Sequence, residues 1–180
     1  VTVAEALRVV REKQGDAIPE AELARIAEAV GVGALRYSML RTAPGSQVTF
    51  RLSDVVNFSG NTALYLQYAY VRARRILDKA GAEPSAAEPE ALSAPEERAL
   101  ALQLALLPSA IRLALQRLDP SLVCQYGFDL AEALSQFYER APVLAAPEPQ
   151  RSARLQLVAR TAQVLGIVLG LLGIPVVERL

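Results

Sequence analysis

The chain has 180 residues, of which 52% are hydrophobic, and its 19 basic side chains balance 19 acidic ones. A chain of this length and composition can bury a substantial core, which excludes disorder of the whole chain. Histidine is absent, which excludes an imidazole base, a histidine-activated nucleophile and a histidine metal ligand. Cys124 is the one cysteine, so an intramolecular disulfide and a thiolate metal cluster are also excluded. We therefore predict no catalytic residue and no metal site, and a cytoplasmic location.

The two ends of the sequence carry little targeting information. The first residues lack the charged-then-apolar pattern of a signal peptide, and the missing initiator Met leads us to expect that the chain begins inside a longer polypeptide. The longest apolar run, Val164 to Val177, is shorter than the roughly 20 residues of a membrane-spanning helix and contains glycines and Pro175. We interpret it as a buried core helix and expect no membrane association.

The first third of the chain predicts two helices and a minor β element. Apolar residues recur at helical spacing from Val3 to Gln14 and from Glu20 to Val30, where glycines at 31 and 33 are interpreted as turn punctuation. After a Pro-Gly-Ser turn, the alternating residues 47–50 predict a short strand. Ser53 or Asp54 then provides a cap for a short helix that includes Val55, Val56 and Phe58.

The rest of the chain predicts a bundle of helices. A long helix from Asn61 to Lys79 is closed by Gly81, and residues 82–95, with three prolines, form a flexible connection. The helices expected beyond it are Glu96–Leu107, Pro108–Leu118, Leu122–Tyr138 (interrupted or bent near Gly127) and Arg151–Leu172. The predicted fold class is mainly α: a helix bundle preceded by a small helical and short-strand segment.

Three polar or aromatic side chains share one face of the long helix. Tyr65 and Tyr68 lie three residues apart, and Arg72 follows Tyr68 by four. Such a stripe is typical of core packing with hydroxyls at the rim, and it also fits a surface on which nucleobases stack. The spacing alone leaves both interpretations open.

The sequence around this stripe resembles one protein family. Gly60-Asn61-Thr62 followed by Tyr65-Leu66-Gln67-Tyr68-Ala69 and Arg72 is similar to the segment of arginyl-tRNA synthetases where the catalytic part passes into the anticodon-binding domain. Further resemblance lies in Phe137-Tyr138 with Pro142-Val143-Leu144, and in the ending Leu171-Leu172-Gly173-Ile174 with Glu178-Arg179. With family-like stretches at 1–3 and 32–37, the likeness covers nearly the whole chain, in order.

The resemblance implies a division of the chain and a set of contact residues. Residues 1–58 would be the C-terminal part of the class I catalytic and stem-contact region, and residues 59–180 an all-α anticodon-binding domain. The family's anticodon-contacting positions fall on Tyr68, Tyr138 and Leu180. Leu180 stands where the family has Met, which keeps an apolar contact but loses the sulfur.

Basic residues on two predicted helices are candidates for contacts to the tRNA backbone. They are Arg72, Arg74, Arg75 and Lys79 on the long helix, and Arg151 and Arg154 at the start of the last one. Each is equally well explained as solvated surface charge. Because the net charge is zero, phosphate binding would depend on such local patches and not on a global field.

The family resemblance implies binding of tRNA(Arg) together with the remainder of the synthetase, by a monomer without DNA as a partner. The parent enzyme would attach arginine to tRNA with ATP and Mg. This chain, with no histidine for a His-Ile-Gly-His motif, should be inactive alone and hold no cofactor. Two alternatives stay open: a freestanding synthetase-like tRNA-binding module, and a non-RNA protein-interaction domain that docks its partner on the apolar last helix.

Overall fold

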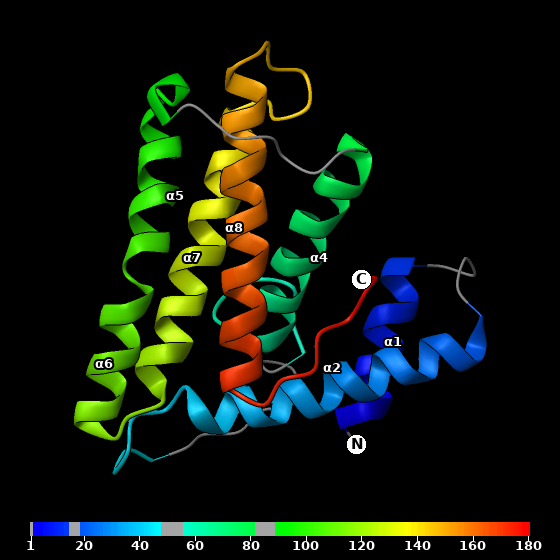
Figure 1. Cartoon of the computed structure of the whole chain (residues 1–180). Helices are drawn as coiled ribbons and strands as arrows, with labels where there is room; N and C mark the ends of the chain where they lie inside the picture. Colours follow the sequence, from blue (N-terminus) through cyan, green and yellow to red (C-terminus); the bar gives the residue numbers. More distant parts are fainter. Residues whose placement is uncertain (1, 15–18, 48–55, 82–88) are drawn as a thin grey trace.

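The regular structure is helical throughout the part of the chain that the computed structural model describes, residues 2–14, 19–47, 56–81 and 89–180 (Figure 1). Its elements are α1 (Thr2–Gln14), α2 (Glu20–Leu40), α4 (Ala63–Ala80), the short 3₁₀ helix η2 (Pro89–Ala91), α5 (Pro95–Ala105), α6 (Leu107–Arg117), α7 (Ser121–Arg140) and α8 (Gln150–Leu171). The predicted mainly α fold is confirmed.

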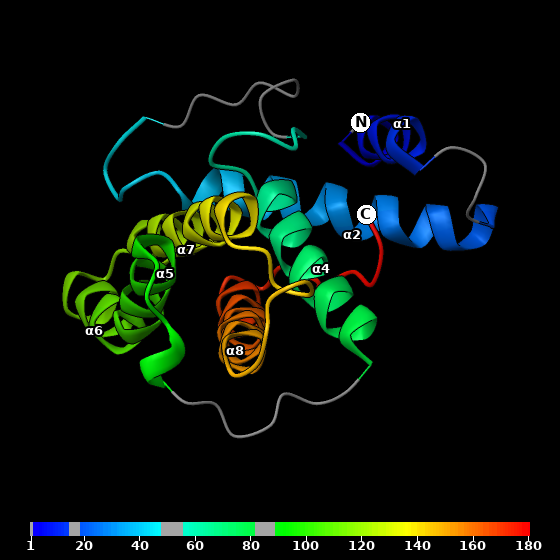
Figure 2. The ribbon, with the colours of Figure 1, turned by 90° about the horizontal axis from the view of Figure 1, so that it is seen from above.

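The helices form a bundle that stands on a second, crossing layer. In Figure 1, α4, α5, α7 and α8 run side by side, and α2 crosses beneath their lower ends with α1 packed on it. Seen along the bundle in Figure 2, α8 lies between α5 and α4, and α7 lies above it in the picture. The chain after α8 turns back over α2, so that the C-terminus lies near α1.

Two hydrophobic clusters hold these layers together. The large cluster fills the bundle and includes Leu66 of α4, Leu130 and Phe137 of α7, and Leu165 of α8, each fully buried. The small cluster joins α1, α2, α4 and the C-terminal residues. Its buried members are Ala6, Val10, Leu23, Ile26, Ala27, Val30, Ala34, Val56, Leu64, Val71, Val177 and Leu180. Because α4 supplies side chains to both clusters, it fixes the bundle against the crossing layer.

The prediction that the second helix ends at Val30 is wrong, because α2 continues through both glycines to Leu40. A Cβ at Gly31 would lie 3.0 Å from the Cα of Val3, and one at Gly33 would lie 2.9 Å from Cγ2 of Ile174. These glycines permit α1 and the C-terminal segment to approach the α2 backbone closely, and they do not punctuate a turn.

Several other predicted elements differ from the structure or lie partly outside the described residues. The α7 helix is continuous through Gly127. The expected strand at 47–50 lies outside the described residues except for Gln47, and Val56 and Phe58 lie in bends and not in a helix. In its described part, the connection expected at 82–95 contains η2 and two backbone amides, of Ser93 and Ala94, held by a buried glutamate.

The last helix is long and apolar enough to pass a membrane-span test of length and composition. In this fold, however, its apolar side chains lie inside the protein: Val158, Leu165, Val168 and Leu169 are fully buried in the large cluster. The helix ends at Leu171, and Gly173 follows in the left-handed conformation with φ of 65°. The structure favours the predicted interpretation of a core helix.

The close approach of α7 to its neighbours predicts a large asymmetry between two helical glycines. A Cβ at Gly127 would lie 2.8 Å from Cγ1 of Val168 and 2.9 Å from Cδ2 of Leu66, whereas one at Gly170 meets nothing within 4 Å. We expect Gly127→Val to lower the free energy of unfolding by about 1–3 kcal/mol through overpacking. Gly170→Val, the matched control, should change it by less than about 0.5 kcal/mol. Urea unfolding measures both, and equal effects would contradict this packing.

The lone thiol should be inert in the folded chain. Cys124 is 1% exposed, and burial raises its pKa from 9.0 to about 12. The folded state therefore keeps the thiol proton to a higher pH than the unfolded chain, so this contribution to stability is complete below pH 9 and is lost as the pH rises toward 12. We expect a thiol reagent at pH 8 to react with Cys124 only in denaturant. Rapid reaction of the native chain would contradict its burial.

Candidate nucleic-acid interface

The α4 helix, which carries most of the candidate residues, has well-defined ends. Thr62 caps its N-terminus, where the hydroxyl accepts a hydrogen bond from the backbone N–H of Tyr65 at 3.1 Å. Gly81 ends the helix in the left-handed conformation, with φ of 72°. These two signals set where α4 begins and ends, and hence its length.

The tyrosines of the stripe point in different directions. Tyr65 packs into the bundle, with its ring centroid 5.6 Å from that of Phe128 and its hydroxyl 3.2 Å from Oγ of Ser135. The Tyr68 ring instead packs against Phe58 in a T-shaped arrangement, with the ring centroids 5.8 Å apart. Core packing is therefore the correct interpretation for Tyr65, whereas Tyr68 lies at the margin of the bundle.

Tyr68 and Tyr138, which are on different helices, meet around one guanidinium. The Cζ of Arg72 lies 4.8 Å from the Tyr68 ring centroid and 5.3 Å from that of Tyr138. Its Nη2 also donates a hydrogen bond to the Tyr68 hydroxyl at 3.1 Å. The two distances from the Arg72 Cζ to the ring centroids are within the range of cation–π attraction. The Tyr138 side chain remains 47% exposed, so part of its ring surface is open to solvent.

These residues line a groove of about 530 Å³. One wall is α4, with Tyr68, Arg72, Arg75 and Lys79, and the other is formed by Tyr138 and the segment from Pro142 to Ala145. Among the described residues that line it, three are cationic and none is acidic. The groove thus combines an aromatic face, an apolar wall and local positive charge, although the net charge of the chain is zero.

The other predicted contact residues lie outside this groove. Leu180 is 2% exposed and belongs to the small cluster, and the partly buried Tyr68 packs against the same cluster. The Leu180 side chain is therefore buried and does not line the groove. Arg151 is partly exposed and lies 3.6 Å from the Glu148 carboxylate.

Arg154 was predicted as a backbone contact, but the structure buries it. The residue is 7% exposed, its Nε lies 2.6 Å from Oε1 of Glu97, and its Nη1 donates to the Pro142 carbonyl at 2.8 Å. A guanidinium engaged in this way is not presented to a phosphate, so Arg154 is not retained as a phosphate contact.

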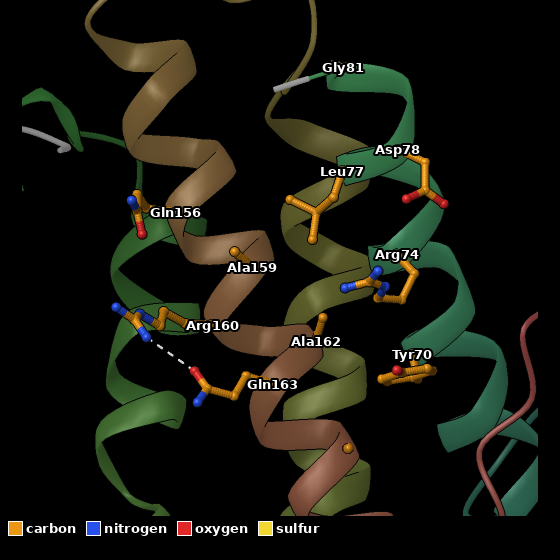
Figure 3. Close-up of a pocket in the computed structure, with 11 residues that line it drawn as sticks. Tyr70, Arg74, Leu77, Asp78, Gly81, Gln156, Ala159, Arg160, Ala162 and Gln163 are labelled. Atoms are coloured by element: carbon orange, nitrogen blue, oxygen red, sulfur yellow. Dashed lines mark hydrogen bonds between the residues drawn. The ribbon is translucent and has the colours of Figure 1, made fainter. Parts of the chain in front are cut away.

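Arg74 lines a separate hollow of about 880 Å³ between α4 and α8. Figure 3 shows Tyr70 and Arg74 reaching from α4, and Gln156, Arg160 and Gln163 on α8. The hollow exists because α8 presents small residues to it, Ala159, Ala162 and Gly166. Arg74 and Arg75, neighbours in sequence, thus lie on different sides of α4.

Sequence reasoning missed one wall of the groove and the aromatic ring that packs on Tyr68. That ring is Phe58, which does not line the groove and lies in a segment that was expected to be helical. The wall at Val143 and Leu144 was noted only as part of a resemblance. Val143 and Leu144 follow soon after Tyr138 in the sequence, and residues that follow a helix end remain near its last turn. This proximity could have placed them beside Tyr138.

Comparison with known proteins identifies the family of this chain. The family model of the DALR anticodon binding domain matches residues 66–180. The chain belongs to the DALR anticodon-binding domain family. The matched range includes α5 to α8, nearly all of α4 and both tyrosines of the groove.

Relatives of this DALR domain chain are arginine–tRNA ligases. One from Methanocella arvoryzae is 38% identical over 94% of this chain and 30% of its own length, and one from a Synechococcus species is 41% identical over 86% and 27%. The solved arginyl-tRNA synthetase of Thermus thermophilus superposes with a TM-score of 0.92 and 37% identity, covering 99% of this chain and 31% of that one. The chain thus spans about 30% of the length of these relatives.

Proposed function

We propose that this chain binds tRNA(Arg) through the anticodon loop, as the C-terminal part of an arginine–tRNA ligase. The observation that supports it most strongly is the groove between α4 and α7, where two tyrosines from different helices meet beside three cations. Bases in an RNA loop are unstacked, and proteins recognise them by stacking on aromatic faces and by hydrogen bonds to their edges. Tyr138 is 47% exposed, so part of its ring is open to a contact of this kind.

The division of labour within the groove follows from chemistry. A base stacks on Tyr138 and contacts the apolar wall at Leu144, while Arg72 presents donors to a base edge or a phosphate. Arg75 and Lys79, further along α4, bind phosphates and position the loop without reading its sequence. Leu180 contributes indirectly, through the cluster behind Tyr68.

The remaining partners and chemistry belong to the same proposal. The rest of the ligase supplies the site that binds ATP and Mg and attaches arginine, and this chain contributes tRNA recognition and no catalytic group. The protein acts as a monomer in the cytoplasm. A complete absence of histidine is consistent with an ATP site located elsewhere in the enzyme.

A binding assay tests the function directly. We expect a filter-binding measurement with a tRNA(Arg) transcript to give salt-sensitive binding, weaker for a tRNA with a different anticodon. Equal affinity for both tRNAs would contradict anticodon recognition, and no binding would contradict the function itself and favour a protein-interaction domain.

The stacking role of Tyr138 is separable from its hydroxyl. We expect Tyr138→Leu to weaken binding of the tRNA(Arg) anticodon stem–loop by about 1–3 kcal/mol, since one aromatic face is lost, and to reduce discrimination against altered anticodons. Tyr138→Phe keeps the face and serves as the matched control, with near wild-type affinity. Because Tyr138 is half exposed, neither change should unfold the chain. Wild-type affinity in the Leu variant would exclude stacking there.

The phosphate contacts predict different salt dependences for two adjacent arginines. Arg75→Ala or Lys79→Ala should each reduce the slope of log affinity against log salt by about 0.7, the value for one contact on a single strand. Arg74→Ala removes the same charge from the other side of α4, and its slope should stay near wild type. If Arg74→Ala flattens the slope as much as Arg75→Ala, the RNA backbone follows the α4–α8 hollow instead.

A further inference from the structure

A buried ion pair joins three segments at the upper end of the bundle. Glu97 of α5 is fully buried, and its Oε1 lies 2.6 Å from the Nε of Arg154 on α8. Its second oxygen accepts hydrogen bonds from the backbone N–H groups of Ser93 and Ala94, both at 2.7 Å. Glu97 thereby satisfies the start of α5 and holds the Arg154 guanidinium at the same time.

The second nitrogen of Arg154 reaches a different part of the chain. Its Nη1 donates to the carbonyl of Pro142 at 2.8 Å. Pro142 begins the segment from 142 to 145 that forms the apolar wall of the groove, and Val143 in this segment is 4% exposed. One planar side chain therefore links the buried carboxylate to the backbone of the groove wall.

Stability alone explains this arrangement poorly. Replacing a buried ion pair by apolar side chains of similar volume is often neutral or stabilising, although removing one partner is strongly destabilising. A guanidinium differs from an apolar side chain in having donors at fixed positions, and here two of them serve two acceptors on different segments. The use of an arginine with two fixed donors is explained if tRNA binding requires the 142–145 wall to stay in one position.

We propose that Arg154, held in place by Glu97, is a positioning residue that fixes the 142–145 wall of the groove opposite α4. The proposal rests on the function proposed above and deepens it, because the wall determines how closely a flat base fits against Tyr138. Without the Pro142 hydrogen bond we expect the segment, which the buried Val143 still holds, to shift away from α4, so that the stacked base loses its apolar contact. Groups that hold a binding site in register act through geometry, without touching the ligand.

The substitution Arg154→Lys separates positioning from charge. Lysine keeps the positive charge beside Glu97, but its single ammonium lacks the separated donors that reach both acceptors. Arg140→Lys is the matched control, because Arg140 forms the neighbouring ion pair with Glu96 at 2.8 Å and is itself largely exposed. Circular dichroism establishes that each variant is folded. If Arg154→Lys is not, the double variant Glu97→Met with Arg154→Met takes its place, with the same expectation.

Two measurements on the full chain decide the proposal. In Arg154→Lys we expect the backbone N–H order parameters of residues 143–146, measured by nuclear magnetic resonance relaxation, to fall below about 0.6, with those of the central turns of α4 and α7 unchanged. We also expect affinity for the tRNA(Arg) anticodon stem–loop to fall by roughly tenfold, with reduced discrimination against altered loops. A merely structural role would lower the order parameters throughout the bundle and leave discrimination unaltered.

The failures of the two proposals are distinguishable. Unchanged order parameters at 143–146 overturn the positioning role, whatever the RNA measurement gives. Lowered order parameters with wild-type affinity and discrimination also overturn it, because the wall would then not matter for binding. If the wild-type chain binds no stem–loop, the proposed function fails, and the order-parameter comparison still decides whether Arg154 fixes the wall.

Discussion

The packing of α4 is the constraint on which the rest of the structure depends. Leu66 on one face of α4 enters the large cluster, and Leu64 and Val71 enter the small one. With these faces occupied, the side that carries Tyr68 and Arg72 is left at the margin of the bundle, beside the end of α7. The groove is thus a consequence of how α4 is held, because a helix fixed on two faces has no freedom to rotate its third.

The C-terminal segment reinforces this constraint. Gln67 of α4 donates a hydrogen bond to the Pro175 carbonyl at 2.7 Å, and Arg36 of α2 donates to the carbonyl of Gly173. Beyond them, Val177 and Leu180 close the small cluster. The close approach that Gly33 permits lies at the same place, since a Cβ there would meet Ile174. The C-terminal segment therefore contacts both the crossing layer and α4 and holds them together.

Local patterns predicted the helices well, because caps and apolar spacing are local properties. Gly81 was predicted as the end of α4, and the structure has it in that role, whereas the helix predicted from Asn61 is capped one residue later, at Thr62. The glycines of α2 misled the prediction because the same residue serves a turn and a close approach between elements. Nothing within the local sequence distinguishes Gly31 in a helix interior from a glycine that ends one.

The burial of individual side chains was less accessible from sequence. Arg154 lies 57 residues from Glu97, and neither local sequence shows that the two charges meet inside the protein. The burial of Leu180 similarly depends on its cluster with residues of α1 and α2, and the local sequence around Leu180 does not indicate that cluster. Resemblance to a family brought Tyr68 and Tyr138 into one hypothesis, and the structure places both against Arg72. The proximity of these two distant tyrosines was thus predicted from the family resemblance and not from residue spacing.

The most direct test of the account is a nuclear magnetic resonance titration of the six tyrosine rings with the anticodon stem–loop of tRNA(Arg). The account predicts that the ring signals of Tyr68 and Tyr138 shift together on binding, since both border the same groove, whereas those of the buried Tyr37 and Tyr126 do not. A complex in which the stem–loop binds and both groove tyrosines keep their free signals would contradict the claim that this groove receives the bases.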